Sequence, residues 1–285
     1  MTLGANQLIK LALGAICCCT IFSHALIAAA TDARSLERIE STDVVGTAFR
    51  LTFSSGRVLQ GKELIGATLS VLLPGDPVAH RVRFDDILVD SRDPDNEVLL
   101  HKVTVVDCGG AKELCDPDPD GNRWMFPLKG QWDPEGRMIS QSGFTLTCLA
   151  GAQGKCVRFG YKPWKTLPNG TDLAEYHRAC VKMVRADYCG DRATTRTGMR
   201  IDLYDDLGIE REAESAGADE LNFEAAWSAD GAVCVAHTRV PENMTVEGVR
   251  NSCPRLNQRL GPASCNATNA KAGLFGKALI FNRSR

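Results

Sequence analysis

The residues whose types and spacing could support catalysis lie in the stretch HRACVKMVRADYCGD, at positions 177–191. His177 and Cys180 are three positions apart, so on a helix they would share one face. A thiolate beside an imidazole is the usual form of an activated cysteine nucleophile. One hypothesis is therefore a hydrolase-like enzyme that uses Cys180 or Cys189 with a nearby histidine and Asp187.

The same residues also have a structural interpretation. The base of a cysteine nucleophile usually comes from another part of the fold, and Cys180 falls on the apolar stripe of the expected helix. His237, three residues after Cys234, is a second candidate base, but nothing in the sequence brings it to His177. In this second hypothesis Cys180 and Cys189 anchor the helix end by disulfides, and His177 and Asp187 satisfy buried polar groups or cap turns.

A second candidate site is the acidic run DPDPDG at 116–121. Asp116, Asp118 and Asp120 match the first half of a calcium loop, but the twelfth position, where an EF-hand has glutamate, is Pro127. Calcium therefore stays a weak hypothesis beside an acidic surface turn, and we expect no other cofactor. Zinc is disfavoured because the shortest spacings among the cysteines after residue 107 are seven, eight, nine and twelve, without CxxC or HExxH.

The N-terminus indicates export. Lys10 precedes the apolar run LALGAICCCTIFSHALIAAA, which ends in a small-residue cleavage pattern near Ala30. We interpret residues 1–30 as a signal peptide, with an uncleaved anchor or a lipoprotein at Cys17–Cys19 as alternatives. No later segment is apolar for long enough to span a bilayer. We therefore expect a secreted or periplasmic, monomeric protein.

Cysteine usage agrees with an oxidising compartment. Three of the twelve cysteines lie in the expected signal, and the other nine all follow residue 107. Nine is odd, so one cysteine is left without a partner within the chain. Cys148 with Cys156 is the first expected local pair and Cys108 with Cys115 the second, while the other five allow too many connectivities to choose among.

Charge excludes one class of partner. The formal net charge is −2, and −3 once a signal carrying one lysine and no acid is removed. Without a basic surplus or a Lys/Arg block, we expect no nucleic acid partner. GxSxG, P-loop and dinucleotide-binding motifs are also missing from the sequence. The aromatic residues offer another kind of site, because these could line a carbohydrate or peptide groove or else fill a core: Trp124, Trp132, Trp164, Trp227 and Tyr161.

The secondary structure expected to position the candidate residues changes along the chain, from strands to a helix and then to strands again. Four alternating or β-branched runs separated by turns predict an antiparallel sheet: VGTAFRLTF, ELIGATLSVLL, RVRFDDILVD and EVLLHKVTVVD. Further on, LPNGTDLAEYHRACVKMVRADYCGD predicts a helix over 172–189, started by Asn169, Thr171 or Asp172 and closed by Gly190. MRIDLYDDLGI predicts a strand, and Asp230-Gly231 the turn of a hairpin.

Four separated blocks resemble one known family. KCVRFGYKPW, HRACVKMVRADYCGD, RIDLYDDLGI and WSADGAVCVAHTR together resemble the ADYC domain of exported bacterial proteins, over roughly residues 140–240. Extended back to GTAFRLTF and GKELIGATL, the likeness would make 31–285 one family unit. The resemblance implies an exported bacterial setting, but it brings no activity, substrate or catalytic residue.

The sequence thus predicts an α+β protein, with an N-terminal antiparallel sheet followed by a disulfide-rich region with one main helix and short hairpins. The expected divisions are a signal at 1–30, a β-rich region at 31–106 and a cysteine-rich region at 107–285. The favoured function is a binding or envelope-associated module whose partner is a protein, a glycan or an envelope component. The alternative is the Cys/His hydrolase, so whether the protein is an enzyme stays open.

Overall fold

A computed structural model describes residues 2–5, 38–72, 78–107, 110–213 and 220–285. It is an α+β structure in which sheets dominate and helices are short, as the sequence predicts. The expected signal at 1–30 lies outside the described residues except for the backbone of β1, Thr2–Ala5. Within the described residues, no helix is long and apolar enough to cross a membrane.

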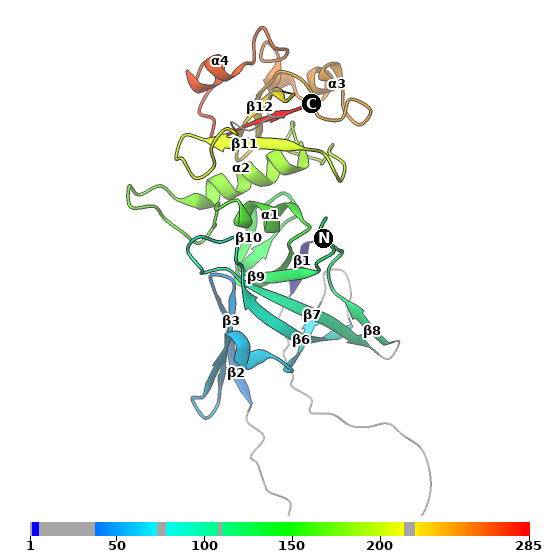
Figure 1. Cartoon of the computed structure of the whole chain (residues 1–285), viewed down its shortest axis with the longest axis vertical. Coiled ribbons are helices and arrows are strands. Elements are labelled where there is room, and N and C mark those ends of the chain that lie inside the picture. The colour runs from blue at the N-terminus through cyan, green and yellow to red at the C-terminus, as the bar shows by residue number, and fades with distance from the viewer. Residues whose placement is uncertain (1, 6–37, 73–77, 108–109, 214–219) are drawn as a thin grey trace, which may run out of the picture.

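The lower half of the molecule in Figure 1 consists of two antiparallel sheets. A small sheet has the order β2-β3-β4, and a larger one has the order β1-β10-β9-β7-β6-β5 with β8 paired to β7. The strands are β2 Ile39–Val45, β3 Ala48–Phe53, β4 Val58–Gln60, β5 Thr68–Leu72, β6 Ala79–Val89, β7 Leu99–Asp107, β8 Gly110–Glu113, β9 Trp124–Trp132 and β10 Met138–Cys148, and the 3₁₀ helix η1, Gly61–Leu64, connects β4 and β5. Phe49, Phe84 and Phe144 meet edge to face in the core between these sheets.

The four predicted runs contain β3, β5, β6 and β7, although Glu63 and Leu64 of the second run lie in η1 instead. β3 and β6 alternate buried and less buried residues as a half-buried strand does, whereas β7 also buries the neighbouring residues Leu100 and His101. The larger sheet continues beyond the expected boundary at residues 106 and 107. His101 on β7 pairs with Met125 on β9, and β9 pairs along its length with β10. The β-rich and cysteine-rich regions therefore share one sheet.

The main helix is α2, Leu173–Arg185, which Figure 1 places between the two halves of the molecule. The Asp172 carboxylate accepts a hydrogen bond from the Ala174 backbone at 2.9 Å and caps the first turn, as expected. The predicted end at 189 is wrong, because the helix stops at Arg185 and Ala186 adopts a left-handed conformation with φ of 49°. The buried face of α2 packs on α1 and on the upper sheet.

The upper half contains a four-stranded antiparallel sheet of order β11-β14-β12-β13. Its strands are β11 Ile201–Asp205, β12 Asn222–Ser228, β13 Gly231–Val235 and β14 Ile280–Ser284. The predicted strand in MRIDLYDDLGI and the hairpin at Asp230-Gly231 are both confirmed. The short helices α3 Val246–Ser252, η2 Pro254–Leu256 and α4 Ala267–Lys271 lie between β13 and β14. The polar C-terminus was not expected to be a strand, yet β14 is a central one with Asn282 and Ser284 fully buried.

Helix α1, Ala152–Arg158, was also not expected, since its sequence AQGKCVR contains a glycine. That glycine is required by close packing: a Cβ on Gly154 would lie 2.4 Å from the carbonyl oxygen of Cys148. The chain therefore turns sharply from β10 into α1. This turn brings Cys156 on α1 against the buried face of α2.

Four disulfides are present in the described residues: Cys115–Cys148, Cys156–Cys180, Cys189–Cys253 and Cys234–Cys265. Both predicted local pairs are therefore corrected. Cys148 lies at the end of β10 beside Cys115, with Cα atoms 5.6 Å apart, whereas Cys156 faces Cys180 across the α1–α2 contact at 5.8 Å. The ninth cysteine, Cys108, lies outside the described residues.

Candidate functional site

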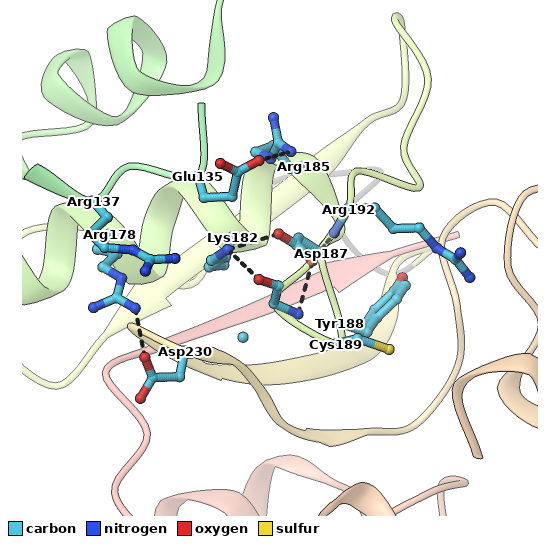
Figure 2. Close-up of polar contacts among 12 residues, drawn as sticks. Glu135, Arg137, Arg178, Lys182, Arg185, Asp187, Tyr188, Cys189, Arg192 and Asp230 are labelled. Atoms are coloured by element: carbon cyan, nitrogen blue, oxygen red, sulfur yellow. Dashed lines mark hydrogen bonds and ion pairs between the residues drawn. The ribbon is translucent and has the colours of Figure 1, made fainter. Parts of the chain in front are cut away.

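The stretch after α2 is a turn held by a buried ion pair. Lys182 Nζ lies 2.9 Å from Oδ2 of Asp187 and donates a second hydrogen bond to the Gly190 carbonyl at 3.0 Å. The other Asp187 oxygen accepts from the backbone N–H groups of Gly190 and Arg192, both at 2.9 Å. Figure 2 shows the Lys182 and Asp187 side chains pointing toward each other. Both oxygens of this carboxylate accept hydrogen bonds from within the turn, as the structural interpretation predicts.

Tyr188 connects this turn to the upper sheet. Its hydroxyl donates to Glu224 Oε1 on β12 at 2.9 Å and accepts from the Arg239 backbone at 2.8 Å. The Arg239 guanidinium binds both Glu224 oxygens and also donates to the carbonyls of Met183 and Val184, the last turn of α2. Burial raises the pKa of Tyr188, so the phenol stays protonated and keeps its donor. Arg239 thus satisfies the terminal carbonyls of α2, and the helix ends at Arg185 for this reason.

The two candidate sulfur nucleophiles are both in disulfides. Cys180 is bonded to Cys156 and Cys189 to Cys253, so neither carries a thiol in this structure. A disulfide sulfur has no proton for a histidine to remove, and the hypothesis of a Cys/His pair therefore finds no support in this geometry.

The candidate histidines lie in different surroundings. His177 is fully buried on α2, with Nδ1 3.0 Å from the Tyr161 carbonyl and its ring edge-on to Trp132. Burial lowers the pKa of His177 to about 4, so its ring is neutral at pH 7. His237 instead has Nε2 3.1 Å from the Ser284 hydroxyl on β14. The structure assigns the two histidines to separate hydrogen bonds rather than to one site.

The acidic loop is organised by its own backbone. Asp118 Oδ1 accepts from the backbone N–H groups of Asp120 and Asn122, at 3.0 and 2.8 Å. Asp120 forms an ion pair with Arg92 at 3.0 Å. Asp116 is exposed. Across the described ranges, no group of three or more acidic, histidine or cysteine side chains is arranged to hold a metal ion. The calcium hypothesis is thus supported only by the sequence pattern DPDPDG.

The aromatic residues lie in the core and along a cleft, and Trp132, which is 6% exposed, belongs to both. Trp227 and Tyr161 are fully buried, and Trp124 packs against the cluster beneath β9. Trp132 and Trp164 together line a cleft of about 270 Å³ between the β2–β3 turn, β9, β10 and the segment after α1. Its other lining residues are mainly apolar: Val44, Gly46, Leu128, Lys129, Met138, Gln141 and Pro163.

Local contacts fix the shape of this cleft. The Trp132 indole donates to the Lys129 carbonyl at 2.8 Å, which holds its ring in place. Gly46 adopts a left-handed conformation with φ of 59°, and the Trp164 ring packs against this turn, with Nε1 3.6 Å from the position of a Cβ on Gly46. Nε1 of Trp164 donates no hydrogen bond to any residue of the described chain. The cleft thus offers apolar rings and one free N–H donor.

One charge pair borders the cleft. Lys129 Nζ lies 3.0 Å from Oδ1 of Asp43 on β2. The hydrogen bond from Lys129 lowers the pKa of the Asp43 carboxyl below its ordinary value. Because both side chains are about half exposed, solvent screens the pair. This pair at the border is neutral overall, and most of the residues that line the cleft are apolar.

A comparison with protein-family models matches residues 61–241 to the ADYC domain. The chain belongs to the ADYC domain family. The match includes Trp132, Trp164 and the whole HRACVKMVRADYCGD segment, but not Val44 and Gly46 of the hairpin. No curated protein and no solved structure matches the chain.

In this ADYC chain, each residue of the Ala186–Cys189 sequence has a structural task. Ala186 turns the chain out of α2, Asp187 closes the turn, Tyr188 reaches Glu224, and Cys189 is bonded to Cys253. Sequence reasoning missed Glu224 and Arg239, which complete this network from 35 or more positions away. One available signal was the presence of a glutamate and an arginine in or beside the apolar β12–β13 hairpin, where a buried charge requires a partner.

Proposed function

We propose that this protein is an exported binding module that uses the cleft between Trp132 and Trp164 to hold an apolar side chain of a partner protein. The single observation that carries the proposal is a formed apolar cleft beside exposed apolar residues. Met138, a lining residue, is 41% exposed, and Val45 and Ile139, next to lining residues, are 59% and 62% exposed. Exposed apolar groups gathered in one place are typical of protein interaction sites.

The size and chemistry of the cleft favour a protein over a glycan. Its volume of about 270 Å³ lies just below the range of about 300–1,000 Å³ that is typical of small-molecule pockets, and it suits a single anchoring side chain. A sugar would also need several hydrogen bonds to its hydroxyls. The lining offers only the Trp164 N–H, the exposed Gln141 amide and the paired Lys129. The free Trp164 N–H is suited to a peptide carbonyl beside the anchor.

Export is supported by the covalent structure. Four disulfides in the described residues are typical of an oxidising compartment, and the apolar run before Ala30 has the form of a signal peptide. Mass spectrometry of the N-terminus of protein recovered outside the cytoplasm tests this part. The expected first residue lies close to Thr31, and an N-terminus at Met1 would contradict cleavage.

The binding site is tested by selecting peptides from a displayed random library on the immobilised mature protein. Enriched peptides should share an apolar anchor and bind the protein with 1:1 stoichiometry in calorimetry. Trp164→Ala and Ile139→Asp should each weaken that binding at least about tenfold, since both remove contact at the centre or edge of the cleft.

Leu274→Asp is the matched control, because Leu274 is 64% exposed and lies in the C-terminal segment rather than in the cleft lining. It should leave peptide binding unchanged. The cleft would be rejected as the site if Leu274→Asp weakened peptide binding as much as Ile139→Asp. It would also be rejected if Trp164→Ala left peptide binding intact. A glycan array run on the same protein provides the second arm: glycan binding lost in Trp164→Ala would assign the cleft to sugars instead.

A further inference from the structure

A second cavity, which shares no lining residue with the aromatic cleft, carries cationic side chains from three segments. It has a volume of about 570 Å³ and is lined by Lys155 of α1, Arg185 at the end of α2, and the 195–201 segment with Arg196 and Arg200. None of its lining residues is acidic. We propose that this cavity binds a phosphate monoester attached to a small apolar or aromatic group.

The unpaired cations are the first argument. Arg239 is neutralised by Glu224, and Arg185 pairs with Glu135 at 3.1 Å, as Figure 2 shows. Lys155, Arg196 and Arg200 have no carboxylate partner among the described residues. Three unpaired cations therefore line one cavity of a chain whose formal net charge is −2. They match a dianionic group, because arginine forks and a lysine ammonium both bind phosphate oxygens.

The cavity is formed rather than a chance gathering of surface side chains. Its outer wall is fixed to α2, because the Arg185 carbonyl accepts from the backbone N–H groups of Thr194 and Thr195, at 3.0 and 3.1 Å. The Thr194 hydroxyl donates to the Ala186 carbonyl at 2.6 Å, and Asn243 holds the Thr194 carbonyl. The turn that contains Tyr188 therefore also positions the loop that carries Arg196 and Arg200.

The inner wall, on α1 and α2, contributes apolar surface from Phe159 and Val184. The outer wall adds apolar surface from Met199 and Ile201 and the hydroxyls of Thr195 and Thr197. Lys155 is half-buried there, and burial lowers the pKa of its ammonium, which an anion bound beside it would reverse. Arg185 also lines a neighbouring cavity, and its Nε is buried without a hydrogen-bond partner. A ligand with one anionic end and one apolar end matches both the cations and the apolar surface.

The test uses phenyl phosphate as the probe, titrated into the mature, disulfide-bonded protein by calorimetry. Inorganic phosphate lacks the ring, and benzyl alcohol lacks the charge. Phenyl phosphate should bind with 1:1 stoichiometry and at least about tenfold more tightly than either, because the cations and the apolar surface contribute separately. Arg196→Ser and Arg200→Ser should each weaken phenyl phosphate binding about tenfold or more, since charged hydrogen bonds are lost.

The control is Arg192→Ser, which changes the same charge in the same loop. Arg192 is exposed, does not line the cavity, and in Figure 2 extends away from the Asp187 turn. Arg196 and Arg200 are exposed as well, so all three variants should unfold at the temperature of the unmodified protein. The proposal is overturned by undetectable phenyl phosphate binding at millimolar concentration, by an equal loss in Arg192→Ser, or by benzyl alcohol binding as tightly as phenyl phosphate.

Discussion

The hydroxyl of Tyr188 lies 2.9 Å from Oε1 of Glu224 and donates its hydrogen bond to that fully buried carboxylate. This contact joins the turn after α2 to the centre of the upper sheet. Glu224 also accepts from Asn282 on β14 at 2.7 Å, and Asn282 in turn accepts from the Trp227 indole at 2.7 Å. One buried network thus connects α2, β12 and the C-terminal strand.

Removing the Tyr188 hydroxyl should destabilise the fold. Tyr188→Phe keeps the ring, which stacks on Trp227, but takes one donor from a buried carboxylate and one acceptor from the Arg239 backbone. The free energy of unfolding in urea should fall by about 1–3 kcal/mol. Tyr204→Phe is the control, because Tyr204 is similarly buried but its hydroxyl has no hydrogen-bond partner within the described chain. An equal loss in the control would contradict the role of the Tyr188 hydroxyl.

The Lys182–Asp187 pair should be far more costly to break than a surface pair. Both side chains are about fully buried, so Lys182→Met leaves the Asp187 charge without its cation and should cost about 3–5 kcal/mol in urea unfolding. Arg250→Met removes one partner of the exposed Glu247–Arg250 pair and should cost about 0–1 kcal/mol. Similar costs for the two variants would show that the buried pair does not hold the turn.

His101 should make stability depend on pH. It is fully buried between Phe49 and Phe84, and burial lowers its pKa from 6.5 to about 4. Between these pH values the unfolded chain binds a proton that the folded chain does not, so this group contributes stability above pH 6.5 that is lost as the pH falls toward 4. The contribution should decrease by roughly 2 kcal/mol from pH 7 to pH 5.

The measurement compares urea unfolding of the unmodified protein and His101→Leu at both pH values. The leucine variant has no ring to protonate. Between pH 7 and pH 5, its free energy of unfolding should therefore change by roughly 2 kcal/mol less than that of the unmodified protein. An identical pH dependence in both proteins would mean that His101 titrates equally in the folded and unfolded states.

The local elements could be predicted from the sequence because their causes are local. The strands β3, β5, β6 and β7 follow from alternating or β-branched runs, and the start of α2 follows from Asp172 as its cap. The end of α2 could not be predicted, because it is set by Arg239, which lies more than fifty positions from the carbonyls it binds. The disulfide connectivity was likewise not predictable, since it depends on how α1 packs against α2.

The candidate site required the tertiary structure. The cleft is assembled from the hairpin at Val44 and Gly46, from β9 and β10, and from Pro163 and Trp164. Tryptophan at these positions indicated an aromatic groove, but the sequence could not tell that Trp132 and Trp164 line a cleft while Trp227 is fully buried.

Thiol mapping of the mature protein decides most directly whether HRACVKMVRADYCGD is a structural framework or a cysteine active site. The protein is alkylated without reductant, reduced, alkylated with a second label, and digested for mass spectrometry, with a non-reduced digest to find linked peptides. Cys180 should carry only the second label and be linked to Cys156, and Cys189 should be linked to Cys253. Rapid first-label modification of Cys180 or Cys189 at neutral pH would contradict the structural role and restore the hypothesis of a cysteine nucleophile.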